Sequence, residues 1–172
     1  MSTIHILTLL FVITVNFLLG LLVYLKSSNH SVKMNFAQIC LAVIFWTIPL
    51  LLTGFFKDPA TIKILRNLAF IAPSFIPHLI MQFSFIFPKK KEVPGLVNFL
   101  LFLLAVIFLI IALFGQIVAT ARLAPNGTVL SLSYHRYNQR LFLIYFVAFS
   151  LLAFREILKN YRHSKGDRKS VV

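Results

Sequence analysis

The sequence is poor in carboxylates and in cysteine. Of 172 residues only four are Asp or Glu, and Asp58, Glu92, Glu156 and Asp167 all lie outside the long apolar runs. A mechanism that pairs two carboxylates at membrane depth is therefore excluded. The single cysteine, Cys40, allows no internal disulfide, and its place inside an apolar run suits an ordinary small apolar side chain.

Sequence motifs for catalysis and metal binding are also missing. The six glycines are scattered singly, so no glycine-rich loop is present to hold a phosphate, and there is no HExxH and no Ser/His/Asp order. No other His, Cys, Asp or Glu lies at ligand spacing from His78. We therefore expect no catalytic residues, no metal and no cofactor, and a protein that is not an enzyme by itself.

Hydrophobic residues, by contrast, make up 59% of the chain, and charged residues only 12%. A soluble domain of this size has no core large enough to hide so much apolar surface, so the bilayer is the expected solvent. The backbone must be paired internally in hydrocarbon, and the apolar runs show no period-two alternation. We expect an all-α fold, a polytopic transmembrane helical bundle with five spans at about 4–25, 34–56, 67–87, 93–120 and 141–158.

The distribution of Lys and Arg predicts the orientation of this bundle. Of the 17 cations, 11 fall in the first and third connections and in the stretch from Arg155 onward, and six fall in the second and fourth connections. The positive-inside bias therefore places the N-terminus outside and the C-terminus in the cytoplasm. Residues 1–160 would form the transmembrane domain, and 161–172 a basic cytoplasmic tail.

The net charge of +13 could also suggest a nucleic-acid partner. The cations, however, lie beside apolar runs rather than on a face of their own, and no motif of stacking aromatics surrounds them. We expect the lipid bilayer as partner and no nucleic acid.

The fifth run is the weakest of the five. Its uninterrupted core, 141–154, has 14 residues, a length more typical of an interfacial or buried segment. Arg140 and Arg155 extend it, because long cationic side chains near a helix end reach the headgroups. We therefore interpret the run as a span.

Two connections carry local structural signals. Asp58 followed by Pro59 predicts a helix that starts ahead of the third run, with Asp58 as N-cap and Pro59 at the first helical position. In the fourth connection, Asn126-Gly127 favours a tight turn between extended arms such as 128–133. A small hairpin on the outer side is expected there.

Three prolines inside the apolar runs predict kinks, because each removes a backbone donor. They are Pro49 in the second run and Pro73 and Pro77 in the third. In the third run two prolines four residues apart make a bend or local unwinding the expected outcome.

Polar residues at membrane depth are the candidate functional residues. Ser74, His78 and Gln82 follow one another at a spacing of four, which places them along one side of the third helix. A histidine in the membrane can sense pH, relay a proton or bind a ligand. The more common role is a neutral contact that fixes helix packing.

Three further amides lie in other runs: Asn16 in the first, Gln38 in the second and Gln116 in the fourth. Together with His78 and Gln82 they either build one intramembrane polar seam that can hold a ligand, or make separate pairwise contacts. Separate contacts are the commoner arrangement for scattered amides.

Several motifs near the ends of the runs form a recognisable series. They are Phe45-Trp46 in the second run, Asn67-Leu68-Ala69-Phe70-Ile71-Ala72-Pro73 entering the third, Phe83-x-Phe85-x-Phe87-Pro88 leaving it, and Tyr161-Arg162-x-Ser164-x-Gly166 with Arg168 after the fifth. With the long segment between the fourth and fifth runs, this order resembles the N-terminal seven-helix membrane (7TM) region of bacterial sensor histidine kinases. The resemblance covers about His5 to Lys169.

The resemblance implies a signal-input module of a two-component system in the bacterial cytoplasmic (inner) membrane. Such a module passes a stimulus to a cytoplasmic output, here a histidine kinase output domain, a partner chain or a homo-oligomer. The family has seven spans, a phosphoacceptor histidine and nucleotide-binding motifs, whereas this sequence offers the first five spans only. Kinase activity is therefore not carried over, and the chain would be a fragment of a longer protein or a subunit completed by a partner. The alternative, from a different class, is a small channel or transporter subunit built on the same polar residues.

Overall fold

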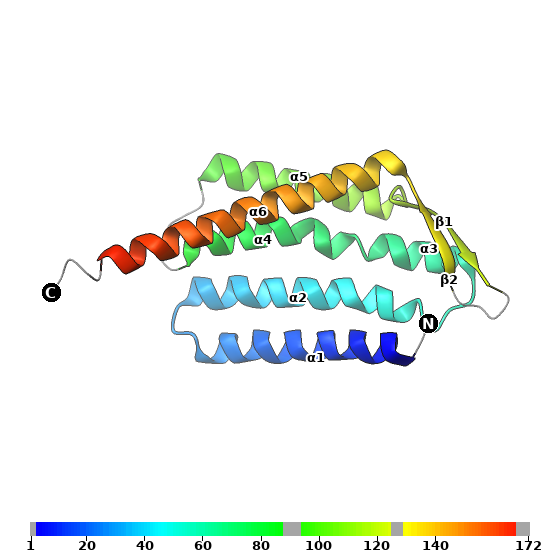
Figure 1. The fold of residues 1–172 in the computed structure, drawn as a ribbon, viewed down its shortest axis with the longest axis horizontal. Coiled ribbons are helices and arrows are strands. Elements are labelled where there is room, and N and C mark those ends of the chain that lie inside the picture. The colour runs from blue at the N-terminus through cyan, green and yellow to red at the C-terminus, as the bar shows by residue number, and fades with distance from the viewer. Residues whose placement is uncertain (1–2, 88–93, 125–128, 168–172) are drawn as a thin grey trace.

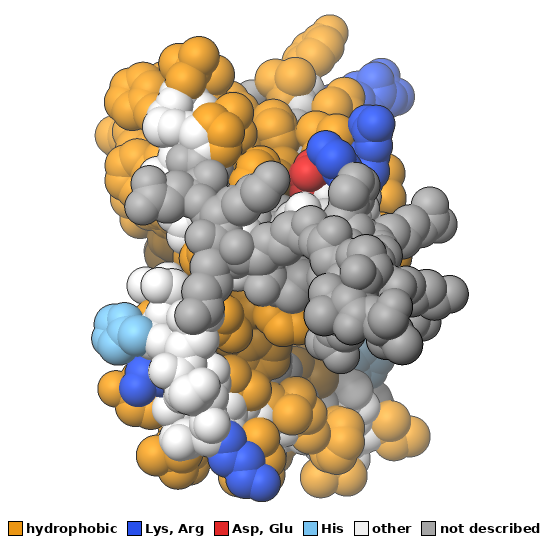
Figure 2. Space-filling view, turned by 90° about the vertical axis from the view of Figure 1, so that its left-hand side faces the viewer, with side chains coloured by type: hydrophobic (Ala, Val, Ile, Leu, Met, Phe, Trp, Pro, Cys, Tyr) orange, Lys and Arg blue, Asp and Glu red, His pale blue; other side chains and the backbone are white. Residues whose placement is uncertain are grey.

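The computed structural model describes residues 3–87, 94–124 and 129–167, apart from the side chains of residues 130 and 162–167. This part of the chain holds five helices long and apolar enough to cross a membrane, which confirms the mostly helical, multi-pass architecture. The helices run side by side along the long axis of the molecule (Figure 1). Seen from the end where α6 finishes, hydrophobic side chains cover the flanks (Figure 2).

The elements in chain order are α1 (Thr3–Lys26), α2 (His30–Leu52), α3 (Pro59–Leu68), α4 (Ile71–Ile86), α5 (Gly95–Leu113), β1 (Val118–Leu123), β2 (Val129–Tyr134) and α6 (Arg136–Asp167). The helices α3 and α4 together make the third candidate span, Pro59–Ile86. The fifth candidate span is the part of α6 from Arg136 to Tyr161.

The third span lies at the centre of the bundle. Its helix α4 packs against α2, α5 and α6, whereas α1 packs against α2 at the edge. Figure 1 shows the same order of layers, with the hairpin at the end where the chain begins and the C-terminal end of α6 at the other. A movement of the third span would therefore change its packing against three of the other four spans.

The contact between α1 and α2 depends on a small residue. Gly20 is the buried residue of α1, and a Cβ atom at this position would lie 3.1 Å from the Cβ atom of Cys40. Small residues of this kind allow two membrane helices to approach closely.

The fourth and fifth spans differ most in length from the sequence prediction. The fourth was expected to reach residue 120, but α5 ends at Leu113. Gly115 adopts a φ of 68°, the left-handed conformation that commonly ends a helix, and β1 begins three residues later. The fifth is longer than expected, since α6 has 32 residues and neither proline nor glycine interrupts it before Gly166.

The expected hairpin is present, and its place on the outer side stays a prediction. The expectation of an all-α fold is corrected to a mostly helical fold with one two-stranded sheet. β1 and β2 pair antiparallel, with Val118 opposite Tyr134 and Leu123 opposite Val129. The predicted turn at 126–127 lies outside the described residues, as does the end of the basic tail from residue 168.

Candidate functional site

The third span begins with a capped helix, as the sequence predicts. The Asp58 carboxylate accepts hydrogen bonds from the backbone N–H and the hydroxyl of Thr61, both at 2.8 Å, and Pro59 occupies the first turn of α3. The Asp58 side chain thus satisfies one of the donors that a helix start leaves free.

The same span is interrupted near its middle. α3 ends at Leu68, α4 begins at Ile71, and Ala69 and Phe70 form the turn between them. Pro73 lies in the first turn of α4, where a missing N–H is tolerated. In a continuous helix the N–H of residue 73 would donate to the Ala69 carbonyl, and a proline at position 73 has no N–H to give. Pro77 and Pro49 lie within helices that continue past them.

Below this interruption, the carboxamide of Gln82 is the centre of a polar network that joins three spans. Its Oε1 accepts a hydrogen bond from Asn35 Nδ2 of α2 at 3.0 Å. Its Nε2 donates to Asn98 Oδ1 of α5 at 3.0 Å and to His78 Nε2 of its own helix at 3.2 Å. We call Asn35, His78, Gln82 and Asn98 the amide–histidine network.

The donor pattern of this network determines the form of the histidine. Because Gln82 Nε2 can only donate, His78 Nε2 accepts, and a neutral imidazole then carries its proton on Nδ1. Both His78 and Asn35 are more than nine-tenths buried, and His78 Nδ1 and Asn35 Oδ1 have no hydrogen-bond partner among the described residues. The Phe102 ring packs edge-to-face with the imidazole, with ring centroids 5.9 Å apart.

A second arrangement of the same four side chains would also be chemically self-consistent, although the structure holds only the first. An imidazole with a proton on Nε2, as in the protonated form, must face an acceptor, so the Gln82 carboxamide has to turn and present Oε1. The carboxamides of both asparagines then have to turn as well. Asn98 would donate to Gln82 Oε1, and Asn35 would accept from Gln82 Nε2. Protonation at His78 would in this way be felt on α2 and α5 together.

Hydrogen bonds from Tyr145 and Asn160 join the third span to α6. The Tyr145 hydroxyl donates to the Ser74 carbonyl oxygen at 2.8 Å, and Asn160 Nδ2 donates to the Ser84 carbonyl oxygen at 2.9 Å. A helical partner for the Ser84 carbonyl would be the N–H of residue 88, which is a proline and has none. Asn160 therefore satisfies a carbonyl that the sequence of α4 leaves free.

At the opposite end, Asn67 connects α3 to the hairpin. Its Nδ2 donates to the carbonyl oxygens of Lys63 and Val118, at 3.0 and 3.1 Å. Its Oδ1 accepts from the backbone N–H groups of Ile117 and Val118, at 3.2 and 2.9 Å. The side chain is 3% exposed and makes four hydrogen bonds, so it ties the start of β1 firmly to the third span.

The structure brings together only two of the six polar residues proposed from the sequence, His78 and Gln82. Ser74 lies one turn from His78, and its hydroxyl donates to the Phe70 carbonyl of its own helix at 2.7 Å. Asn16 likewise donates to Val12 of α1 at 2.8 Å. The other two are exposed, Gln38 on α2 and Gln116 beyond the end of α5.

Sequence reasoning missed four asparagines, namely Asn35, Asn67, Asn98 and Asn160. Each lies close to the end of an apolar run, where an amide is expected to face headgroups rather than another helix. The available signal was that the third span, with its prolines and its serines, offers carbonyls and a carboxamide that need donors from neighbouring helices.

Comparisons with protein-family models, with curated proteins and with solved structures found no match to this chain.

Proposed function

We propose that this chain is a non-enzymatic signal-input module of a multi-pass membrane protein, of the kind that precedes the kinase core in sensor histidine kinases. In this proposal the third span is the movable element and α6 carries the movement toward a cytoplasmic output domain or partner. The observation that supports it best is the interrupted third span, which contacts α2, α5 and α6 at once.

The interruption divides the third span into two halves with different attachments. Asn67 fixes α3 to the hairpin, whereas the amide–histidine network fixes the far half of α4 to α2 and α5. A turn at Ala69 and Phe70 lets one half change its angle while the other keeps its contacts. A stimulus at the hairpin end can therefore reach the other end of the bundle through α4.

The contacts between α4 and α6 supply a route to the output. Tyr145 and Asn160 lie 15 positions apart on α6 and donate to carbonyls near the two ends of α4. A tilt of α4 would thus displace α6 at two points along its length, Tyr145 and Asn160. In the proposed orientation α6 ends in the cytoplasm, where a kinase output would be attached.

The network gives the module two states. In one state His78 Nε2 accepts a hydrogen bond from Gln82, and in the other it carries a proton and donates. A ligand or proton shifts the equilibrium between two such states only by binding them unequally. The aromatic and amide groups recorded in contact with His78 carry no charge, so the imidazole itself is the titrating group of this cluster.

The channel or transporter alternative receives less support from the positions of the polar residues. A water-filled path needs polar side chains in line through the bilayer. Asn16, Gln38 and Gln116 lie apart from the amide–histidine network, and Phe102 covers one side of His78.

The experiment is a distance measurement by electron–electron resonance on full-length chain in nanodiscs. Spin labels replace Met34 and Leu158, two exposed residues on α2 and α6, in a Cys40→Ala background. Protons serve as the probe, with measurements at about pH 8 and at about pH 4, well below the ordinary imidazole pKa of about 6.5. We expect the distance distribution to change with pH in the parent protein and to stay fixed in His78→Leu.

Two results would overturn the proposal. One is a distance distribution that is the same at both pH values, which would show that the network is not coupled to α6. The other is an ion flux across proteoliposomes that His78→Leu abolishes, which would make the chain a channel or transporter subunit.

A further inference from the structure

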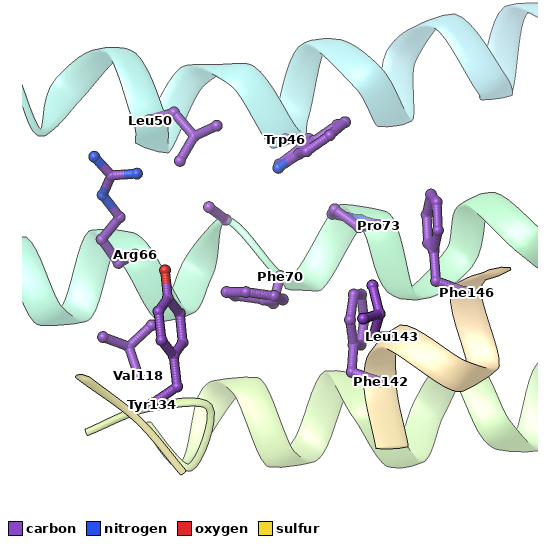
Figure 3. A pocket seen from close by; sticks show the side chains of 11 residues that line it. Trp46, Leu50, Arg66, Phe70, Pro73, Val118, Tyr134, Phe142, Leu143 and Phe146 are labelled. Atoms are coloured by element: carbon purple, nitrogen blue, oxygen red, sulfur yellow. The ribbon is translucent and has the colours of Figure 1, made fainter. Parts of the chain in front are cut away.

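A pocket of about 370 Å³ lies at the interruption of the third span, near the hairpin. Figure 3 shows Trp46 and Leu50 of α2 on one side, Phe70 and Pro73 at the interruption, and Phe142 of α6 on the other side. This volume is at the small end of the range for ligand pockets, so it suits one alkyl chain better than two.

One end of this otherwise apolar pocket is polar. Arg66 of α3 and Tyr134 of β2 both line it, and in Figure 3 both side chains point toward α2. The Nε atom of Arg66 is buried, and no described residue accepts a hydrogen bond from it. Guanidinium groups bind carboxylate and phosphate with two parallel hydrogen bonds, so an Arg whose buried Nε lacks an acceptor favours an anionic head group when it lies beside an apolar pocket.

We propose that this pocket binds a single-chain amphiphile with an anionic head group, a carboxylate or a phosphate monoester. The head group pairs with Arg66 and accepts a hydrogen bond from the Tyr134 hydroxyl. The alkyl chain lies among Trp46, Phe70 and Phe142. Binding fills the space between α2 and α6 directly over the turn at Ala69 and Phe70.

As a binding site, the pocket stands independently of the signalling proposal. As the place where the stimulus enters, it rests on the proposed function. A ligand here touches both the α3 side and the α4 side of the interruption, since Arg66 precedes the turn and Pro73 follows it. It would therefore select the angle between the two halves of the third span.

The chain contains its own probe of occupancy, because Trp46 is its only tryptophan and lines the pocket. The test uses full-length protein in nanodiscs of zwitterionic phosphatidylcholine and measures quenching of Trp46 fluorescence. The quenchers are a dibrominated long-chain fatty acid, the matching alkyl phosphate, and the uncharged methyl ester. We expect saturable quenching by the two anions and only a linear, unsaturable component with the ester.

Arg66→Gln should weaken the saturable component by about tenfold or more, because it removes a charged hydrogen-bonding partner. The matched control is Arg122→Gln, since Arg122 is exposed on β1 and does not line the pocket. If Arg66→Gln does not fold, Leu143→Phe provides a second variant, because it adds bulk at a partly open wall and leaves Arg66 in place.

Quenching that is equally strong with acid and ester, or unchanged in Arg66→Gln, would overturn the site and leave ordinary lipid contact at Trp46. Equal saturable quenching by a brominated two-chain anionic phospholipid would overturn the single-chain assignment. Saturable binding without a change in the Met34–Leu158 distance would leave the site intact and reject the signalling role.

Discussion

At the scale of residues, neutral amides rather than charges hold the third span in place. Asn67, Gln82 and Asn160 each connect this span to another element. Leaving a polar group without a hydrogen bond in hydrocarbon costs free energy, so each amide favours the packing that gives it a partner. Burying an amide also costs less free energy than burying a charged side chain.

Gln82→Leu should destabilise the protein, because the change leaves Asn35, Asn98 and His78 without their shared partner. We expect a loss of roughly 1–2 kcal/mol in the free energy of unfolding, as for other hydrogen bonds between membrane helices. Denaturant titration in mixed micelles measures it. Gln38→Leu is the matched control, since Gln38 is exposed on α2, and equal losses in the two variants would contradict a central role for the network.

Asp58 gives a pH dependence at the start of α3. Hydrogen bonds from the Thr61 backbone N–H, and then from the Thr61 hydroxyl, hold the pKa of this carboxyl below its usual range. The stabilisation by the ionised cap is therefore present above the ordinary Asp pKa of about 3.9 and is lost as the pH falls through the lower folded-state value.

We expect carbon chemical shifts of Pro59 to Ile62 to report an ordered first turn at neutral pH and fraying in strong acid. Asp58→Asn caps without a charge and should keep the turn ordered throughout, while Asp58→Ala should fray at every pH. An acid transition that persists in Asp58→Asn would assign the pH dependence to another group.

At the scale of elements, prediction from sequence succeeds where the signal is local. Asp58 and Pro59 specify the start of α3, because capping needs only neighbouring residues. The early end of α5 was missed because residues 114–120 are mostly apolar, with Gln116 and Thr120 as exceptions, and hydropathy does not register the left-handed Gly115. The partners of Gln82 were missed for a different reason, since they depend on which helices lie adjacent.

Asn67→Leu should release the hairpin from α3. It leaves the N–H groups of Ile117 and Val118 without their acceptor, at a cost of about 1–3 kcal/mol for a buried unpaired group. Amide hydrogen exchange at these two residues should become faster. Asn138→Leu, which removes one exposed hydrogen bond to the Gln116 carbonyl, should leave that exchange nearly unchanged.

The edge helix α1 depends on the absence of a side chain at Gly20. Gly20→Leu forces a side chain against Cys40, and overpacking of this kind costs about 1–3 kcal/mol. We expect a lower melting temperature and weaker disulfide cross-linking between cysteines introduced on α1 and α2. Gly95→Leu is the control, because a Cβ atom there meets no other atom within 4 Å, and a similar loss in both variants would refute the close-contact explanation.

At the scale of the whole molecule, the five candidate spans follow from length and hydropathy. The packing order does not, because the long apolar runs are apolar on most sides and little in the sequence marks α4 as the central helix. The prolines and hydroxyl residues of the third run are the partial exception, since a helix that needs donors from its neighbours has to be surrounded by them.

The orientation of the bundle is still a prediction, and both of its ends offer an exposed serine for a test. Ser28 lies between α1 and α2, and Ser131 lies on β2 at the opposite end of the bundle. In a Cys40→Ala background, Ser131→Cys should react with a membrane-impermeant maleimide in intact bacterial cells, whereas Ser28→Cys should react only after permeabilisation. The parent Cys40→Ala chain should stay unlabelled. The reverse pattern would place the hairpin, Arg66 and the amphiphile pocket on the cytoplasmic side, and any stimulus would then have to come from inside the cell.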